Sequence, residues 1–495
     1  MRKFAGLAVG TTGAKIVVFG QDGALLDKVY QAYPSSRDKT KQELDASLLR
    51  DSVLSLFRRV LDKHPDLEGL GIASFGESFV CLDENDEPVY PILLYTDPRG
   101  KDECDRLIAS IGEEAIEQKT GLKPHEMYSL PKLAYWKSHD PKGFSSVKKV
   151  FLMEDYCLYL LTGKRYIDYS LASRTLGFNL KEKGYDTDIF WALGLDPSLL
   201  STPVPAGTPV RGLREEFGPG HEDFIVLPAG HDQFACSLGS MVLKPGQAME
   251  GAGTVECIVP LVKDIPDLSA LAKDNYNLVP YFDRGYLTYA FSYTGGAAVD
   301  WFLHSLNPGA KTLASKEGKS VYEYLMEHYA HAPTGILFLP HLAGAATPYM
   351  DLGSKGAFLG LHLGTDEKDL FLAVLEGVAY EARLNIETLA KHGVSITSMV
   401  ASGGGSKNPV WNQIKADVTG IPITILKGEE AGARGSAMLL AVSLGLYPSL
   451  KEAAQAFVQI QEVVSPDFEA KKKYDKAYSR YAKAYQAVRP LLEEE

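Results

Sequence analysis

The chain has 495 residues, of which 45% are hydrophobic and 23% charged, as is typical of a soluble globular protein. Its length predicts about two to four domains. The 63 acidic and 51 basic residues give a net charge of −12. This charge argues against a general nucleic-acid-binding protein, because phosphate backbones require a basic surface.

The five cysteines form no CxxC pair, so the sequence argues against a disulfide framework or a zinc site and favours a reducing compartment. No apolar run is long enough to span a bilayer. Residues 1–6 lack the apolar core of a signal peptide. We therefore expect a cytoplasmic protein with no membrane partner and no metal held directly by side chains.

The first predicted element is a hairpin. Strands at 4–9 and 15–19 flank a turn that contains Thr11 and Thr12. The amides and hydroxyls of this turn can surround a phosphate, with charge from Lys15. The turn is not a P-loop, because a strand rather than a helix follows it. Taken alone, it is more typical of an ordinary Gly-Thr hairpin.

A predicted helix at 45–63 leads to a short apolar strand at 69–74, which is followed by Glu77. A carboxylate at the end of a strand can accept hydrogen bonds from more than one sugar hydroxyl. A solvated carboxylate in a turn is an equally open interpretation. Helices are predicted further on, at 127–136 and 153–161.

A second apolar strand, 224–227, ends at a Pro-Ala-Gly break that is followed by His231, Asp232 and Gln233. Asp232 can accept a proton from a substrate hydroxyl, and the amide of Gln233 can hold that substrate. Alternatively, Asp232 is only the N-cap of a helix at 234–238. The stretch alone favours the cap.

After Asp232, the sequence repeats the pattern found at the start of the chain. Residues 248–258 repeat the build of residues 5–18, with an extended segment, a Gly/Thr turn and a second strand. A restart near half the length suggests two related halves, with the boundary near residue 245. Gly253 and Thr254 then form a second candidate phosphate turn.

The second half contains a glycine-rich loop between a strand at 396–401 and a helix at 410–419. Gly404 and Gly405 suit a flat or anionic ligand lying against backbone, although flexible turns are a commoner use of three glycines. Asn408 is a good N-cap for the helix.

Other elements are predicted nearby. A strand at 286–293 precedes a helix that opens at Thr294, and Thr365 is predicted to cap a long helix in which Gly377 indicates close packing. Residues 431–437 predict a small-residue helix. A last helix, 468–492, carries tyrosines at helical spacing that predict packing against the body of the protein.

Taken together, these segments resemble the FGGY family of carbohydrate kinases. The matching segments run from Leu7-Ala-Val-Gly-Thr-Thr-Gly-Ala-Lys15 to Gly403-Gly-Gly-Ser-Lys-Asn-Pro-Val-Trp-Asn-Gln-Ile-Lys-Ala-Asp417. Between them lie Met127–Trp136, Gly230-His-Asp-Gln233 and Ala343–Leu361. Each segment is moderately specific, and their order strengthens the resemblance.

The resemblance implies an α/β fold of two actin-like (ribonuclease H-like) ATPase domains, 1–245 and 246–495, with ATP and Mg²⁺ in the cleft between them. It implies a small sugar, a ketose or polyol, as substrate, and makes Asp232 the general base. Glu77 and Gln233 would bind the sugar. The implied nucleotide-binding residues are Thr11, Thr12, Lys15, Gly253, Thr254, Gly296, Asp300, Gly404, Gly405 and Asn408. A homodimer is common in the family.

One departure from the family concerns Ala8, which stands where the first loop usually has an acidic residue that organises Mg²⁺. Magnesium would then be held mostly by nucleotide phosphates and water. A weakly catalytic nucleotide- and sugar-binding protein is therefore an alternative. A glycosidase that uses Glu77 and Asp232 is a third possibility. Phe75-Gly-Glu-Ser differs from the runs typical of xylulokinases and glycerol kinases, so the sugar stays open.

Overall fold

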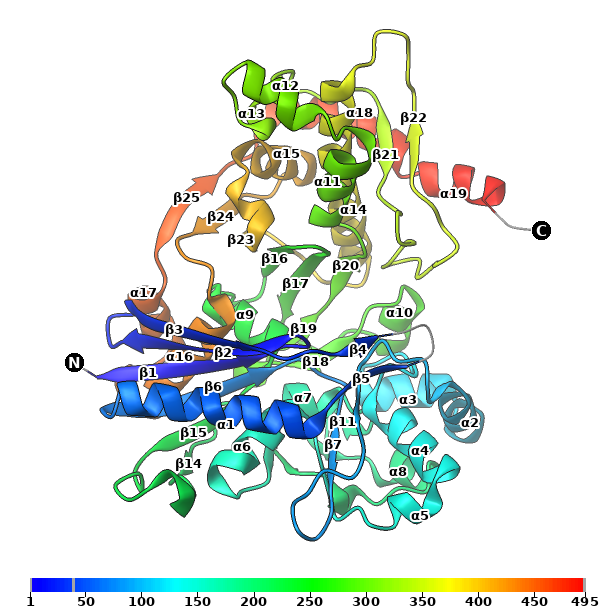
Figure 1. The fold of residues 1–495 in the computed structure, drawn as a ribbon. Coiled ribbons are helices and arrows are strands. Elements are labelled where there is room, and N and C mark those ends of the chain that lie inside the picture. The colour runs from blue at the N-terminus through cyan, green and yellow to red at the C-terminus, as the bar shows by residue number, and fades with distance from the viewer. Residues whose placement is uncertain (1, 38–40, 493–495) are drawn as a thin grey trace.

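The computed structural model describes residues 2–37 and 41–492 and contains two central sheets with helices around them (Figure 1). The first sheet has the strand order β14–β15–β6–β1–β2–β3. In it, β1 pairs antiparallel with β2 and parallel with β6, and β6 pairs parallel with β15. Its strands are β1 (Lys3–Val9), β2 (Gly13–Gly20), β3 (Leu25–Ala32), β6 (Leu67–Ser74), β14 (Val210–Arg211) and β15 (Ile225–His231).

The second sheet repeats this arrangement. Its order is β18–β19–β17–β16–β23–β24–β25, and β20 also pairs with β17. Again a hairpin, β16–β17, is extended by two parallel strands, β23 and β24. Its strands are β16 (Gln247–Ala252), β17 (Glu256–Val262), β18 (Leu278–Pro280), β19 (Tyr286–Thr288), β20 (Ala290–Ser292), β23 (Ser398–Ser402), β24 (Ile423–Leu426) and β25 (Ile460–Val464).

Short strands pair outside the two sheets. They are β4 (Ser36–Arg37), β5 (Gln42–Leu44), β7 (Val80–Leu82), β8 (Ile92–Leu93), β9 (Lys149–Phe151), β10 (Tyr166–Asp168), β11 (Phe178–Asn179), β12 (Gly184–Tyr185), β13 (Thr202–Val204), β21 (Leu337–Leu339) and β22 (Ala357–Leu359).

Helices of the first half are α1 (Ala46–Lys63), α2 (Lys101–Ile111), α3 (Glu113–Thr120), α4 (Ser129–His139), α5 (Pro141–Phe144), α6 (Met153–Thr162), α7 (Tyr169–Ser173), α8 (Thr187–Ala192) and α9 (Asp232–Gly239). The later helices are α10 (Leu268–Lys273), α11 (Gly296–Trp301), α12 (Ala310–Lys316), α13 (Val321–Leu325), α14 (Glu367–Lys391), α15 (Pro409–Thr419), α16 (Ala431–Ser443), α17 (Leu450–Phe457), α18 (Phe468–Tyr481) and α19 (Ala484–Val488).

Helix α16 follows β24 of the second sheet in sequence but lies against the first sheet (Figure 1). Glycines make this contact possible. A Cβ at Gly6 of β1 would lie 2.2 Å from the carbonyl oxygen of Ala433, and a Cβ at Gly435 would lie 2.1 Å from that of Ala235 in α9. The prediction that residues 431–437 form a helix suited to close approach is therefore confirmed. The packing fixes the start of α9 relative to β1.

Several predicted elements differ from the structure. The strand predicted at 286–293 is interrupted at Tyr289, and the helix predicted at 468–492 ends at Tyr481. The cap predicted at Thr365 is instead Asp366, whose carboxylate accepts hydrogen bonds from two helical amides. The close packing predicted at Gly377 is confirmed, because a Cβ there would lie 2.3 Å from the carbonyl oxygen of Phe338.

Within residues 2–37 and 41–492, no helix combines the length and apolarity needed to cross a membrane.

Candidate active site

Asp232 occupies the junction between β15 and α9. The helix begins at Asp232 itself, and the residue before it, His231, is the N-cap. His231 Nδ1 accepts a hydrogen bond from the amide of Gln233 at 3.4 Å. The interpretation of Asp232 as the cap of a helix at 234–238 is therefore wrong, because the imidazole has that role.

The Asp232 carboxyl group is enclosed on one side and open on the other. Its side chain is 47% exposed, but Oδ1 is buried and has no hydrogen-bond partner among the described residues. Burial raises the pKa of Asp232 to about 6. His231 Nδ1 lies 3.3 Å from Oδ1, and burial together with the Arg174 charge lowers the His231 pKa to about 4. The imidazole is therefore neutral near pH 7 and adds no charge.

A buried polar network holds this junction. Glu154 of α6 accepts hydrogen bonds from the amide of Gly230 at 2.5 Å and from that of Asp168 at 3.1 Å. The hydroxyl of Ser170 accepts one from the amide of His231 at 2.9 Å. Asp168 in turn caps α7. The segment 168–175, which reads in the sequence as a hydroxyl-rich connection, thus positions the candidate base.

Glu77 lies after β6, next to this junction, in a left-handed backbone conformation with φ 65°. It is 4% exposed, so the interpretation as a solvated turn carboxylate is wrong. Arg174 Nε donates to Glu77 Oε1 at 2.5 Å, and Nη2 contacts the same oxygen. This ion pair also leaves Glu77 poorly suited to be the catalytic acid of a glycosidase.

Arg174 is the site residue that sequence reasoning missed. Its guanidinium lies 5.2 Å from the ring centroid of Tyr128 and 6.0 Å from that of Tyr289. The Tyr289 ring also lies 6.0 Å from the His231 ring. Gly76 makes room, because a Cβ there would be 3.0 Å from both the Arg174 and His231 side chains. These contacts bring β6, α7, β15 and the second sheet together.

The first candidate phosphate turn connects β1 and β2. It is closed by a hydrogen bond from the amide of Gly10 to the carbonyl of Gly13 at 2.9 Å. Thr12 is exposed and Thr11 half-buried. Lys15 is paired with Glu430, at the start of α16, at 2.6 Å. Its charge is thus balanced by a carboxylate in this structure.

The second turn, between β16 and β17, exposes Gly253 and Thr254. Their carbonyl oxygens accept hydrogen bonds from the start of α11: Gly296 N donates to Gly253 at 2.8 Å, and Gly295 N donates to Thr254 at 2.9 Å. A Cβ at Gly405 would lie 2.8 Å from Ala252 Cβ. The structure therefore brings together the turn, Gly296 and the glycine-rich loop.

Two other predicted nucleotide residues have different surroundings. The Asn408 side chain caps α15 by accepting from the amide of Trp411 at 3.1 Å. Asp300 is exposed on α11.

A buried charge cluster lies beneath the second turn. Lys415 lies 2.8 Å from Glu256 and also contacts Glu250, and all three side chains are buried. This cluster joins α15 to the β16–β17 hairpin.

Two thiols, Cys236 in α9 and Cys257 in β17, have raised pKa values. Burial raises the pKa of Cys236 to about 12, and the charges of Asp232 and Lys15 also act on this thiol. Burial raises the pKa of Cys257 in β17 to about 12 as well, with further contributions from Asp232 and Glu256.

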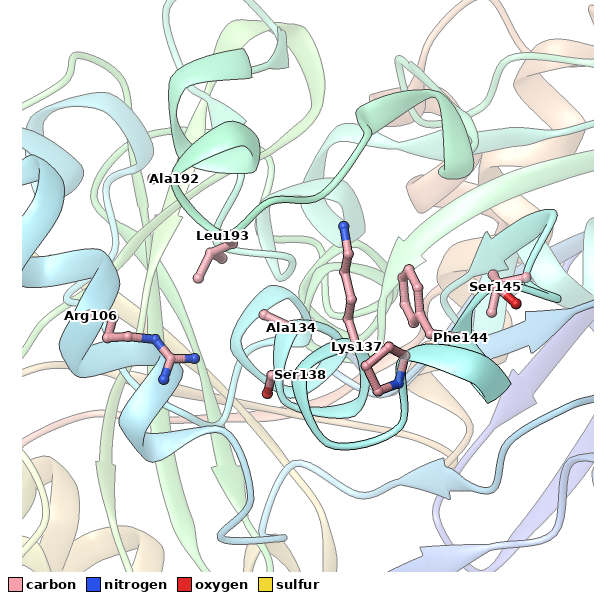
Figure 2. Close-up of a pocket in the computed structure, with 10 residues that line it drawn as sticks. Arg106, Ala134, Lys137, Ser138, Phe144, Ser145, Ala192 and Leu193 are labelled. Atoms are coloured by element: carbon pink, nitrogen blue, oxygen red, sulfur yellow. The ribbon is translucent and has the colours of Figure 1, made fainter.

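A separate cavity of about 620 Å³ lies among α2, α4, α5 and α8 (Figure 2). It contains none of the predicted site residues. Its lining residues are Arg106, Ala134, Lys137, Ser138, Pro141, Phe144, Ser145, Val147, Ala192 and Leu193. The candidate base lies elsewhere, where β15 meets α9.

Comparison with known proteins gives matches to two family models. Residues 4–239 match the N-terminal domain of the FGGY family of carbohydrate kinases, and residues 276–444 match its C-terminal domain. Xylulose kinase from Staphylococcus xylosus is 24% identical, over 97% of this chain and 99% of that protein. Gluconokinase from Bacillus subtilis is 25% identical, over 90% of this chain and 87% of that protein.

The fold is shared with solved structures. The crystal structure of xylulose kinase from Rhodospirillum rubrum has a TM-score of 0.89 and 22% identity, and it covers 100% of both chains. These neighbours have two actin-like domains, as the sequence analysis expects.

Proposed function

Because the chain belongs to the FGGY family of carbohydrate kinases, and is therefore an ATP-dependent sugar kinase, we propose that Asp232 is its general base. The observation that carries the proposal is a carboxyl group at the junction of β15 and α9, with a pKa raised to about 6 and Oδ1 buried without a partner among the described residues. A base with a pKa just below neutral is ionised at pH 7 yet still basic enough to take a proton.

In the proposed reaction, Asp232 accepts the proton of the acceptor hydroxyl. The sugar oxygen forms a bond to the γ-phosphorus of ATP, and the bond from that phosphorus to the β–γ bridging oxygen breaks to release ADP. Positioning and charge neutralisation supply most of the catalysis in such transfers. The proton leaves Asp232 to solvent after the product departs.

We assign the nucleotide to the two glycine-containing hairpin turns and the glycine-rich loop. Gly253, Thr254, Gly296 and the loop at 404–405 are close together, and small residues there let a ligand approach the backbone. The exposed Thr12 and its neighbour Thr11 would hold phosphate oxygens from the other side. When bound, Mg²⁺ would neutralise phosphate charge, held mainly by the phosphates and water.

Lys15 needs a rearrangement to meet a phosphate. It is paired with Glu430, which Lys28 also contacts at 2.5 Å. The two lysines supply two positive charges to one carboxylate. A phosphate can therefore share Lys15 while Lys28 keeps Glu430 compensated.

The decisive test is an ADP-release assay of the purified protein against pentuloses, hexuloses, heptuloses and polyols. Asp232→Asn should lower turnover by roughly 10²–10⁴-fold, because a positioned base contributes about that much. Nucleotide affinity, measured by calorimetry, should hardly change. Asp223→Asn is the control, since that carboxylate is exposed and pairs with Arg211. Turnover retained in Asp232→Asn would remove this residue as the base.

Ala8 favours a second candidate function, a sugar- and nucleotide-binding protein with weak catalysis. Calorimetry with ATP and the same sugars would reveal it as tight binding without ADP release. Turnover at rates ordinary for a kinase would exclude it.

A further inference from the structure

Three buried polar atoms near His231 have no hydrogen-bond partner among residues 2–37 and 41–492. They are Asp232 Oδ1, Arg174 Nη1 and the hydroxyl oxygen of Tyr289. Buried polar groups in proteins almost always have partners. The Tyr289 ring centroid lies 6.0 Å from the Arg174 guanidinium carbon and 6.0 Å from the His231 ring centroid. A sugar hydroxyl can donate to the carboxylate oxygen and accept from the guanidinium or the phenol, so a sugar that reaches this cluster would supply the missing partners.

The charges around this cluster cancel. Arg174 is paired with Glu77 through Nε and Nη2, which leaves Nη1 to donate to something else. Glu77 is the carboxylate that acts on the Arg174 pKa, which is raised despite burial. His231 is neutral because its pKa is about 4. Apart from Asp232, the residues around this cluster therefore offer hydrogen-bond donors and acceptors but carry no net charge.

We propose that the Glu77–Arg174 pair makes the acceptor site select an uncharged sugar, a ketose or a polyol, over a sugar acid. Arg174 Nη1 donates to a sugar oxygen, which a carbonyl or a hydroxyl can provide. A sugar carboxylate would have to lose water beside Glu77 and Asp232 with no unmatched cation to receive it. The inference rests on the proposed kinase function and specifies its substrate class.

The first experiment compares substrates with the unmodified enzyme. ADP release is measured with ketoses, polyols and aldonates of equal carbon number at pH 7.5, chosen well above the Asp232 pKa. The best uncharged sugar should exceed the best aldonate by at least roughly tenfold in kcat/KM. Equal or better use of an aldonate overturns this inference and leaves the kinase function intact. No release with any sugar overturns the proposed function itself.

The second experiment changes the charge of the Glu77–Arg174 pair. Glu77→Gln leaves Arg174 buried without its counter-ion, so an anionic sugar now compensates the guanidinium. The ratio of kcat/KM for aldonate over uncharged sugar should rise by roughly tenfold or more. An unchanged ratio contradicts the inference.

A matched control is Asp97→Asn, which removes a carboxylate from another buried pair in the same half, with Arg99 at 2.7 Å. It should lower the melting temperature without moving the substrate ratio. If Glu77→Gln is too unstable to assay, Glu77→Gln combined with Arg174→Met removes the buried charge altogether. That double variant should still reject aldonates but use uncharged sugars less well, because the Nη1 donor is lost. A double variant with wild-type kinetics overturns the role of the pair.

Discussion

The Asp232 carboxyl group has to meet two opposite requirements. It must lose water to become a better base, and it must stay open to a substrate. The structure meets both, because Oδ1 is enclosed while the side chain remains 47% exposed. Its neighbour His231 stays neutral, and burial raises the Asp232 pKa above its ordinary value of 3.8 although the Arg174 charge acts to lower it.

This environment predicts a pH dependence. The base acts only when it is deprotonated, so kcat/KM should rise as pH increases through about 6 and level off above it. The measurement is a pH profile of ADP release with saturating Mg²⁺. A profile that is flat from about pH 5 to 8 would contradict the pKa of Asp232 as the controlling ionisation.

The same pKa links activity to stability. A carboxyl group whose pKa is raised by folding contributes stability that is present below the ordinary pKa and is lost as pH rises through 6. Asp232→Asn should therefore be slightly more stable than the unmodified protein at about pH 8, and no more stable near pH 3. Thermal melting at the two pH values tests the sign.

Ala8 gives a further prediction at this scale. It pairs with Lys15 across the β1–β2 hairpin. Because Ala8 is two residues after Gly6 in β1, both lie on the same face of the sheet, which α16 covers. A carboxylate there would join Lys15 and Glu430 near the first turn. We expect Ala8→Asp to raise the phosphorylation rate at saturating Mg²⁺. Ala73→Asp on the neighbouring strand is a control for added charge, and an unchanged or lower rate in Ala8→Asp shows that position 8 does not limit catalysis.

At the scale of elements, the sequence predicts the positions of the strands better than it predicts the helices or which elements pack together. The hairpin at 4–19 and the strand leading to Asp232 have clear apolar runs and glycine turns, so they could be predicted. The sequence analysis does not predict helices α2 and α3, which are short and begin with charged residues. The small residues of α16 predicted close packing, but not that its partners would be β1 and α9.

Gly435 tests how strongly α16 determines the position of α9. Alanine is intrinsically the better helix former, by about 1 kcal/mol. A Cβ at this position would nevertheless lie 2.1 Å from the Ala235 carbonyl oxygen, so Gly435→Ala should lower the free energy of unfolding by about 1–3 kcal/mol. Gly184→Ala is the control, because its Cβ would meet nothing within 4 Å. Denaturant unfolding of both variants is the measurement, and equal stability would show that α16 shifts at no cost.

At the scale of the molecule, two sheets of the same strand order meet around His231. Tyr289 lies between β19 and β20 of the second sheet, and its ring is near Arg174, which follows α7, and His231, which ends β15. This contact could not be predicted from the sequence, since residues 174, 231 and 289 are far apart in the chain and no local pattern marks Arg174 or Tyr289. The glycine-rich turns and Asp232 could be predicted, because each is a local motif. The assignment of these residues to roles stays a prediction.

Tyr289→Phe tests whether the sugar bridges the two halves. The hydroxyl is buried without a partner among the described residues, so its removal should not destabilise the protein. The KM for the sugar should rise by roughly tenfold, while the KM for ATP stays the same. Tyr380→Phe removes another such hydroxyl in the second half and should change neither constant. An unchanged sugar KM in Tyr289→Phe would place the substrate away from this ring.

The return of α16 and α17 to the first sheet has a consequence for biosynthesis. A ribosome has made nearly the whole polypeptide before residues 431–457 emerge, and until then the glycine-lined face of β1 and β6 has no cover. The half that is synthesised first therefore cannot complete its packing until most of the second half has been made. A nascent chain stopped at residue 245 should need chaperones, and release of the remaining residues should end that need.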